Sequence, residues 1–142
     1  MVIKNYGLAL RDPEPEAWVF GAYPLPTTPL NPSGEWKDFL PIFEAQAIDF
    51  ETYGCVSYGT LNAYEVLFKF IHGEEKNFSE RFIYILAHIR PPGSDPHFVA
   101  EVIRNNGVIP ETSLPRTKTY EEFIQPDPME SHYLIEGQKF PY

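Results

Sequence analysis

The chain has 142 residues, of which 43% are hydrophobic and 22% charged, and its formal net charge at pH 7 is −9. This length fits one domain that can bury most of its apolar surface without disulfides or metals. The negative charge and the lack of any basic stretch argue against a nucleic-acid-binding surface, because contacts to phosphates need clustered Lys and Arg, so we expect no nucleic-acid partner.

Cysteine usage and apolar runs set further bounds. Cys55 is the only cysteine, which excludes an internal disulfide framework and argues against a zinc site, so we expect no metal and no cofactor. No run approaches 18 apolar residues, so we expect no membrane-spanning segment and no membrane partner. The N-terminus lacks the apolar core of a signal peptide, which favours a cytoplasmic or virion-associated protein over one secreted through a signal peptide.

Proline divides the chain. Seven of the 15 prolines fall within residues 13–41, eight fall within 91–141, and residues 42–90 contain none. Residues 1–43 therefore predict an extended arm, because prolines at this density forbid a long helix. We expect the arm to pack on the body of the protein, since disordered linkers contain fewer aromatic residues. The interleaved aromatic residues of the arm are Trp18, Phe20, Tyr23 and Trp36.

Residues 44–142 predict one helical subdomain, which begins with a helix at the cysteine. From Cys55 to about Ile71, apolar residues recur at steps of three and four. This spacing indicates an amphipathic helix whose apolar face lies in the core. Gly73 follows as the stop signal.

Two more helices follow with recognisable ends. Asn77–Glu80 fits a capping box, in which Asn77 caps the helix and Glu80 reaches back, and predicts a helix to about Ile89. Asp95-Pro96 supplies an N-cap and a proline at the first helical position. Because Asn106-Gly107 supplies a left-handed stop, residues 96–105 are predicted to form a third helix.

The C-terminal third predicts two short helices and little strand. Thr119 caps a short fourth helix, and Asp127-Pro128 opens a fifth that ends near Gly137. Strand signals are limited to the stretch around Gly107–Ile109 and to parts of the arm. The fold class predicted from these patterns is mainly α.

Cys55 is the candidate nucleophile. A thiol in the first turn of a helix faces unpaired backbone N–H groups and the positive end of the helix dipole. Both favour the thiolate, which is the reactive form of cysteine. The alternative is a small buried thiol that packs like an apolar residue.

Three segments in order resemble papain-like cysteine peptidases. The first resembles the family's nucleophile helix through Cys55, Ser57, Tyr58, Thr60, Leu61, Ala63 and Glu65. The second, Phe78-Ser79-Glu80, is similar to the start of the family's next helix. The third runs from Val99 through Asn106-Gly107 to Pro115 and resembles a helix, an Asn-Gly turn and the apolar residues behind it.

The resemblance covers roughly residues 44–116 and is strongest to divergent phage and bacterial members of the family. It implies that the chain is the helical half of a papain-like fold, which becomes α+β if a β-rich second half completes it. Peptides or proteins are then the substrates, and Cys55 attacks the peptide carbonyl. The family signature differs from this chain at the residues flanking the cysteine, where Gly54 and Val56 stand here.

The resemblance also implies an oxyanion-hole glutamine. The family places it six residues before the cysteine, where this chain has Asp49. Gln46, nine residues before Cys55, meets this role if the intervening loop is three residues longer. A surface glutamine without a role is the alternative.

The general base is not evident. The family's histidine lies about 130–150 residues beyond the cysteine, whereas the sequence given extends 87 residues past it (142 − 55 = 87). We expect the base in a missing C-terminal half or a second protein chain. Of the four histidines, His132 is the best in-chain candidate by sequence distance, and a structural or solvated histidine is the alternative at every position. The other three are His72, His88 and His97.

Two functions follow from these patterns. The first is a papain-like thiol protease, a hydrolase that is inactive as an isolated 142-residue chain. The second is a catalytically inactive structural or binding protein on the same scaffold, such as a phage particle component. A smaller papain-like fold of the kind found in cell-wall hydrolases, with His132 as base, ranks third. Paired acids are interpreted as solvated faces or helix-dipole partners; they are Asp49 and Glu51, Glu74-Glu75 and Glu121-Glu122.

Overall fold

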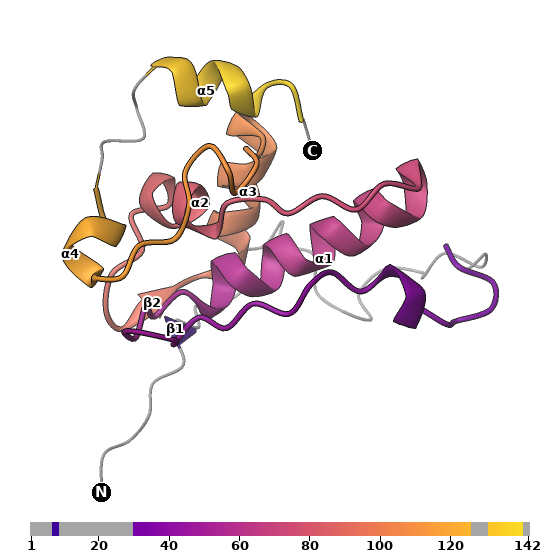
Figure 1. The fold of residues 1–142 in the computed structure, drawn as a ribbon, viewed down its shortest axis with the longest axis horizontal. Coiled ribbons are helices and arrows are strands. Elements are labelled where there is room, and N and C mark those ends of the chain that lie inside the picture. The colour runs from indigo at the N-terminus through magenta and orange to yellow at the C-terminus, as the bar shows by residue number, and fades with distance from the viewer. Residues whose placement is uncertain (1–6, 9–29, 126–130, 141–142) are drawn as a thin grey trace, which may run out of the picture.

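The computed structural model describes residues 7–8, 30–125 and 131–140, and the chain is mainly helical (Figure 1). This confirms the predicted fold class. The helices are α1 (Cys55–His72), α2 (Glu80–Leu86), α3 (Pro96–Asn106), α4 (Tyr120–Phe123) and α5 (Ser131–Gly137), with a 3-10 helix η1 (Lys37–Phe39). Two short strands, β1 (Gly7–Leu8) and β2 (Gly93–Ser94), pair in parallel. Within the described ranges, every helix is too short or too polar to traverse a bilayer.

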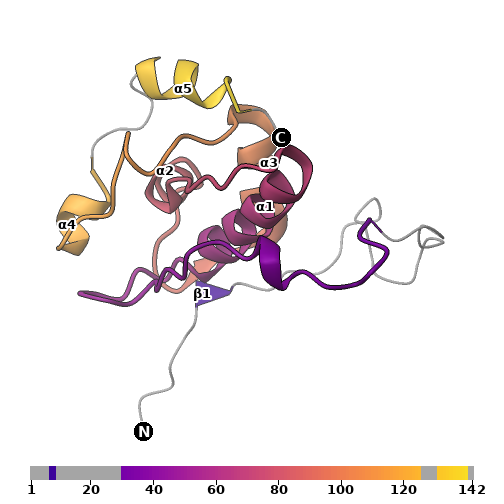
Figure 2. The same cartoon turned by 45° about the vertical axis from the view of Figure 1, so that its right-hand side comes forward.

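The long helix α1 forms the centre of the fold, and α2 and α3 pack against it (Figures 1 and 2). The core between them is rich in aromatic and β-branched side chains that are fully buried. Burial of such side chains supplies most of the free energy that holds the helices together. The largest of them are Tyr84, Phe78, Phe82, Phe123, Leu61, Ile83, Ile89 and Ile103.

The ends of α1 and α3 agree with the sequence signals. Gly73 adopts the left-handed conformation and donates its N–H to the carbonyl of Lys69. The Asp95 side chain accepts the N–H of His97, and Gly107 ends α3 at a positive φ of 71°. Thr119 likewise caps α4 by accepting the N–H of Glu122. Each of these signals acts within one helical turn, which is why it can be read locally.

The prediction for the second helix is wrong at both ends. The Ser79 hydroxyl, not Asn77, caps α2 by accepting the N–H of Phe82 at 3.1 Å. The Asn77 side chain instead donates to the Glu44 carboxylate at 2.6 Å. The helix ends at Leu86 rather than about Ile89, and His88 lies beyond it at a left-handed φ of 48°.

The remaining predicted elements differ in detail. Residues 107–109 are not a strand; the neighbouring Pro110 forms an isolated bridge with Phe78. The predicted start of the fifth helix at 127–128 lies outside the described residues, and α5 is described from Ser131.

Part of the predicted arm is described, namely residues 7–8 and 30–43. The rings of Trp36 and Phe39 pack against Phe70 of α1, with centroid separations of 5.2 and 5.1 Å. The predicted contacts of Trp18, Phe20 and Tyr23 lie outside the described residues. From η1 the chain runs along α1 to the N-terminal end of this helix (Figure 1). The residues that precede Cys55 therefore lie beside α1.

Candidate active site

Cys55 is the first residue of α1, and its side chain is partly exposed. The turn before it is fixed by short polar contacts, since the Gly54 carbonyl accepts the N–H of Tyr58 at 3.0 Å and the hydroxyl of Ser57 at 2.9 Å. The Gly54 N–H in turn donates to the hydroxyl of Thr52 at 3.1 Å. Contacts among four buried residues, Thr52, Gly54, Ser57 and Tyr58, therefore fix the position of the cysteine at the start of α1.

The backbone at this turn is tight. Tyr53 has a φ of 58°, a left-handed conformation that costs a residue with a side chain free energy. A methyl group on Gly54 would lie 3.0 Å from the Thr52 hydroxyl and 3.3 Å from the Tyr84 ring. Strain and close packing of this kind are common where a fold must present a reactive side chain.

The electrostatics around Cys55 oppose the thiolate. Partial burial raises the pKa of the Cys55 thiol, and the negative charge of Glu51 raises this pKa further. The direction is opposite to the one expected from the helix N-terminus alone. Within the described residues, the chain holds Cys55 as a thiol near neutral pH.

Gln46 lies beside the same carboxylate. Its side-chain nitrogen donates to Oε1 of Glu51 at 3.2 Å, and this oxygen also accepts the N–H of Tyr53 at 2.8 Å. The structure thus brings Gln46 to the acid whose charge acts on Cys55. In this state the amide is engaged by Glu51, so it must turn away before it can bind an oxyanion.

The histidines lie elsewhere. His72 ends the helix that Cys55 begins, about 26 Å away at the helical rise per residue. His88, just beyond α2, and His97, at the start of α3, are both exposed. His132 is exposed and stacks on Tyr133, with ring centroids 3.9 Å apart. It lies on α5, on the opposite side of the fold from the start of α1 (Figures 1 and 2).

The three segments that resemble papain-like peptidases meet through hydrogen bonds. Oε1 of Glu65, on α1, accepts the N–H of Phe78 at 2.8 Å. Ser79 then donates its N–H to the carbonyl of Ile109 at 2.9 Å and its hydroxyl to the carbonyl of Leu114 at 2.6 Å. Segments that are far apart in sequence are therefore joined around the start of α2.

Sequence reasoning missed a group of acidic side chains near this junction. Glu65 and Glu80 are only 5% and 4% exposed. Burial raises the pKa of Glu65 to about 7 and that of Glu111 to about 7. Burial and the neighbouring Glu44 raise the pKa of Glu80 to about 10. One signal was available, because Glu65 follows Leu61 by four residues and so lies on the apolar face of the predicted helix.

Arg116 connects the segment after α3 to the loop before Cys55. Its guanidinium donates to the Tyr58 hydroxyl at 2.5 Å and to the carbonyl of Gln46 at 3.1 Å. The same group lies 4.8 Å from the centroid of the Phe50 ring. These contacts hold the loop that carries Gln46 against α1, one turn beyond Cys55.

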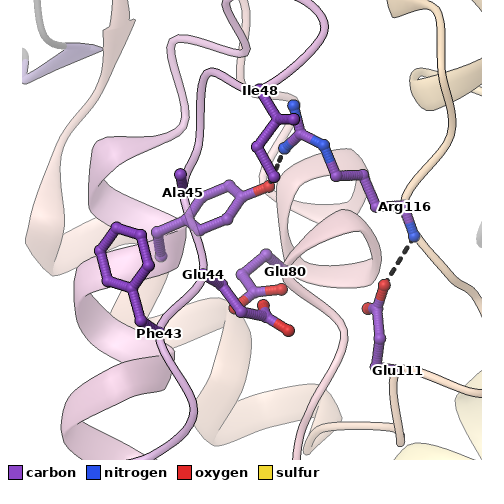
Figure 3. A pocket seen from close by; sticks show the side chains of 8 residues that line it. Phe43, Glu44, Ala45, Ile48, Glu80, Glu111 and Arg116 are labelled. Carbon is purple, nitrogen blue, oxygen red and sulfur yellow. Dashed lines mark hydrogen bonds between the residues drawn. The ribbon is translucent and has the colours of Figure 1, made fainter.

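A pocket of about 130 Å³ opens beside Arg116 (Figure 3). Its walls combine acidic, apolar and aromatic side chains, and Cys55 is not among them. The lining residues are Phe43, Glu44, Ala45, Ile48, Tyr58, Glu80, Glu111 and Arg116.

Comparison with protein-family models, with curated proteins and with solved structures finds no match for this chain. In the described part of the chain, no three Cys, His, Asp or Glu side chains form a group that could hold a metal ion. The paired acids at 49 and 51, 74–75 and 121–122 are all exposed.

Proposed function

We propose that this chain is the helical half of a papain-like cysteine peptidase, with Cys55 as its nucleophile. The observation that carries the proposal is the junction between the three segments that resemble the family. Glu65 bonds to Phe78, and Ser79 bonds to both Ile109 and Leu114. The same junction positions α2 and the segment after α3 relative to the helix that begins at Cys55.

The proposed reaction is hydrolysis of a peptide bond in a peptide or protein substrate. The Cys55 sulfur attacks the carbonyl carbon, and the backbone N–H of Cys55 with the amide of Gln46 stabilises the oxyanion. An imidazole from outside the described residues takes the thiol proton and passes it to the leaving amine. Water then hydrolyses the thioester and releases the acid product.

The raised pKa of the Cys55 thiol explains why such an imidazole is needed. An imidazolium beside the sulfur would favour the thiolate and offset the charge of Glu51. His132 is not proposed for this role, because α5 lies across the fold from Cys55 (Figure 1). The base therefore comes from a C-terminal segment or a second chain.

The test is hydrolysis of a quenched fluorescent peptide library by the complete polypeptide that the gene encodes, with the Cys55→Ser variant as control. The proposal expects cleavage that the variant abolishes while its melting temperature stays unchanged. It also expects iodoacetamide to modify Cys55 of the complete polypeptide at a rate that stays high down to about pH 5. Absence of cleavage by the complete polypeptide, tested both alone and together with the protein chains that co-purify with it, contradicts the proposal.

A second candidate is a catalytically inactive structural or binding protein on the same scaffold, for example in a phage particle. The raised pKa of Cys55 beside Glu51 favours it, since a thiol of this kind is unreactive near pH 7. It expects alkylation of Cys55 to increase only at and above about pH 8.5, the ordinary thiol range, in every form of the protein.

A further inference from the structure

Exposed apolar side chains gather on the segment 40–48. Phe43 is 88% exposed, and Ile48 and Ile42 are 66% and 69% exposed. With Leu40, this segment holds four of the eight exposed large apolar side chains in the described part of the chain. Such a concentration of exposed apolar side chains in nine residues favours a contact with another molecule.

The pocket beside Arg116 opens within this surface. Phe43 and Ile48 stand at its rim, and the carboxyl groups of Glu44 and Glu80 point toward one another behind them (Figure 3). Glu111 lies on the far wall. Exposed apolar side chains and acidic side chains therefore line the same pocket.

The pocket is lined by more acidic than basic side chains, namely Glu44, Glu80 and Glu111 against Arg116. Of the residues that the structure describes, Arg116 is the only Lys or Arg that lines the pocket, and its guanidinium is already bonded to Tyr58 and Gln46. Among the described residues, Oε2 of Glu111 and Nε of Arg116 are both buried without a hydrogen-bond partner, so Arg116 does not satisfy this carboxylate oxygen. A buried carboxylate oxygen without a donor is unfavourable, so the site gains free energy from any donor that reaches it.

The size of the pocket indicates what can enter. Its volume of about 130 Å³ is well below the roughly 300–1,000 Å³ of pockets that enclose a whole small ligand. It can take the end of one long side chain. Ammonium and guanidinium groups are the side-chain ends that carboxylates bind most strongly.

We propose that segment 40–48 and the pocket form a docking surface for a protein segment that inserts one Lys or Arg side chain between Glu44, Glu80 and Glu111. Apolar residues beside that cation cover Phe43 and Ile48. The overall charge of −9 favours the approach of a basic partner. Burial and the neighbouring charge of Glu44 raise the pKa values of Glu80 and Glu111, and a cation placed among the three would lower both. This inference concerns a surface apart from Cys55 and does not depend on peptidase activity.

The test uses a short fluorescein-labelled peptide of alternating Lys and Leu, with a Glu–Leu peptide and a Lys–Ser peptide as comparisons. Fluorescence anisotropy with the 142-residue chain at physiological salt measures each dissociation constant. The proposal expects the Lys–Leu peptide to bind at least about tenfold more tightly than both others, a difference of about 1.4 kcal/mol. Equal binding of the Lys–Leu and Lys–Ser peptides overturns it, because the apolar surface then contributes nothing.

Matched variants locate the binding. Phe43→Ser and Glu111→Gln should each weaken Lys–Leu binding at least about fivefold. Phe98→Ser and Glu121→Gln make the same chemical changes at exposed residues on α3 and α4 and should leave binding unchanged. An equal loss in the control variants overturns the proposal. The glutamine side chain introduced by Glu111→Gln can still accept the backbone N–H of Arg116, and a urea unfolding curve checks that each variant is folded.

Two other occupants are distinguished by further measurements. Sedimentation velocity that shows self-association removed by Phe43→Ser would assign the surface to a second copy of this chain and overturn the proposal. Binding of n-butylguanidinium alone as tightly as the Lys–Leu peptide would assign the pocket to a small cation and also overturn it.

Discussion

The backbone N–H of Phe78 donates a hydrogen bond of 2.8 Å to the buried carboxylate of Glu65, on the helix that begins at Cys55. This bond joins α1 to the residues that lead into α2. It satisfies a backbone donor in a place that is closed to water, where an unpaired N–H is costly. The position of α2 relative to the candidate nucleophile therefore depends on one acidic side chain.

The pH dependence of stability tests the burial of this acid. Burial raises the pKa of Glu65 to about 7. The folded state then binds more protons than the unfolded state between about pH 4.5 and 7, so stability decreases as pH increases through this range. Since one pKa unit corresponds to about 1.4 kcal/mol, we expect Glu65 by itself to make the free energy of unfolding in urea on the order of 2 kcal/mol lower at pH 8 than at pH 5.

The Glu65→Gln variant provides the control for this prediction. Glutamine still accepts the N–H of Phe78 but has no charge to bury. The variant should therefore lose less stability than the wild type between about pH 5 and pH 8. The acids Glu80 and Glu111 leave a residual slope of the same sign, because burial raises their pKa values as well. A wild-type protein that becomes more stable with increasing pH would contradict this account.

Ser79 and Asn77 form a second test. Ser79→Ala removes the cap on the N–H of Phe82 and the hydrogen bond to the carbonyl of Leu114. We expect a loss of about 1–2 kcal/mol in the free energy of unfolding. Asn77→Ala removes an exposed bond to Glu44 and should cost less than half as much. If Asn77→Ala instead lowers the urea midpoint of unfolding more than Ser79→Ala does, Asn77 rather than Ser79 caps α2.

Two glycines of the nucleophile turn and helix should respond oppositely to alanine. A methyl group at Gly54 would crowd Thr52, Ser57 and Tyr84, so Gly54→Ala should destabilise the protein by about 1–3 kcal/mol. Gly59 lies in α1 with nothing within 4 Å of an added methyl group. Gly59→Ala should stabilise the protein by up to about 1 kcal/mol through helix propensity. Thermal unfolding of both variants measures the contrast, and equal effects would show that the turn is loosely packed.

The charge of Glu51 should control the reactivity of Cys55. Glu51→Gln removes the charge that raises the pKa of the thiol, so alkylation by iodoacetamide at about pH 7.5 should become about two- to fivefold faster. Asp49→Asn makes the same charge change on the same exposed loop and should have a smaller effect. Cys55 is the only thiol, so mass spectrometry of the alkylated chain reports on it directly. An unchanged rate in Glu51→Gln would exclude this acid as the cause.

Helix ends with local signals were predictable from the sequence. Gly73 and Gly107 end α1 and α3 at positive φ, and Asp95 caps α3 through its own side chain. The start of α2 was not predictable in the same way. Asn77 is a residue type that often caps helices, but its side-chain amide donates instead to the carboxylate of Glu44, from a distant part of the chain. The hydroxyl of Ser79 then caps the helix in its place.

Patterns within one or two helical turns were enough to predict the helical periodicity, the local stop signals and the position of Cys55 at the start of a helix. The environment of that cysteine depends instead on the folded chain. Partial burial and the charge of Glu51 raise the pKa of Cys55. The Gln46 side chain is hydrogen-bonded to Glu51 rather than placed beside the sulfur of Cys55. The burial of Glu65 and Glu80 has the same origin, since their charge states depend on segments that meet only in the tertiary structure.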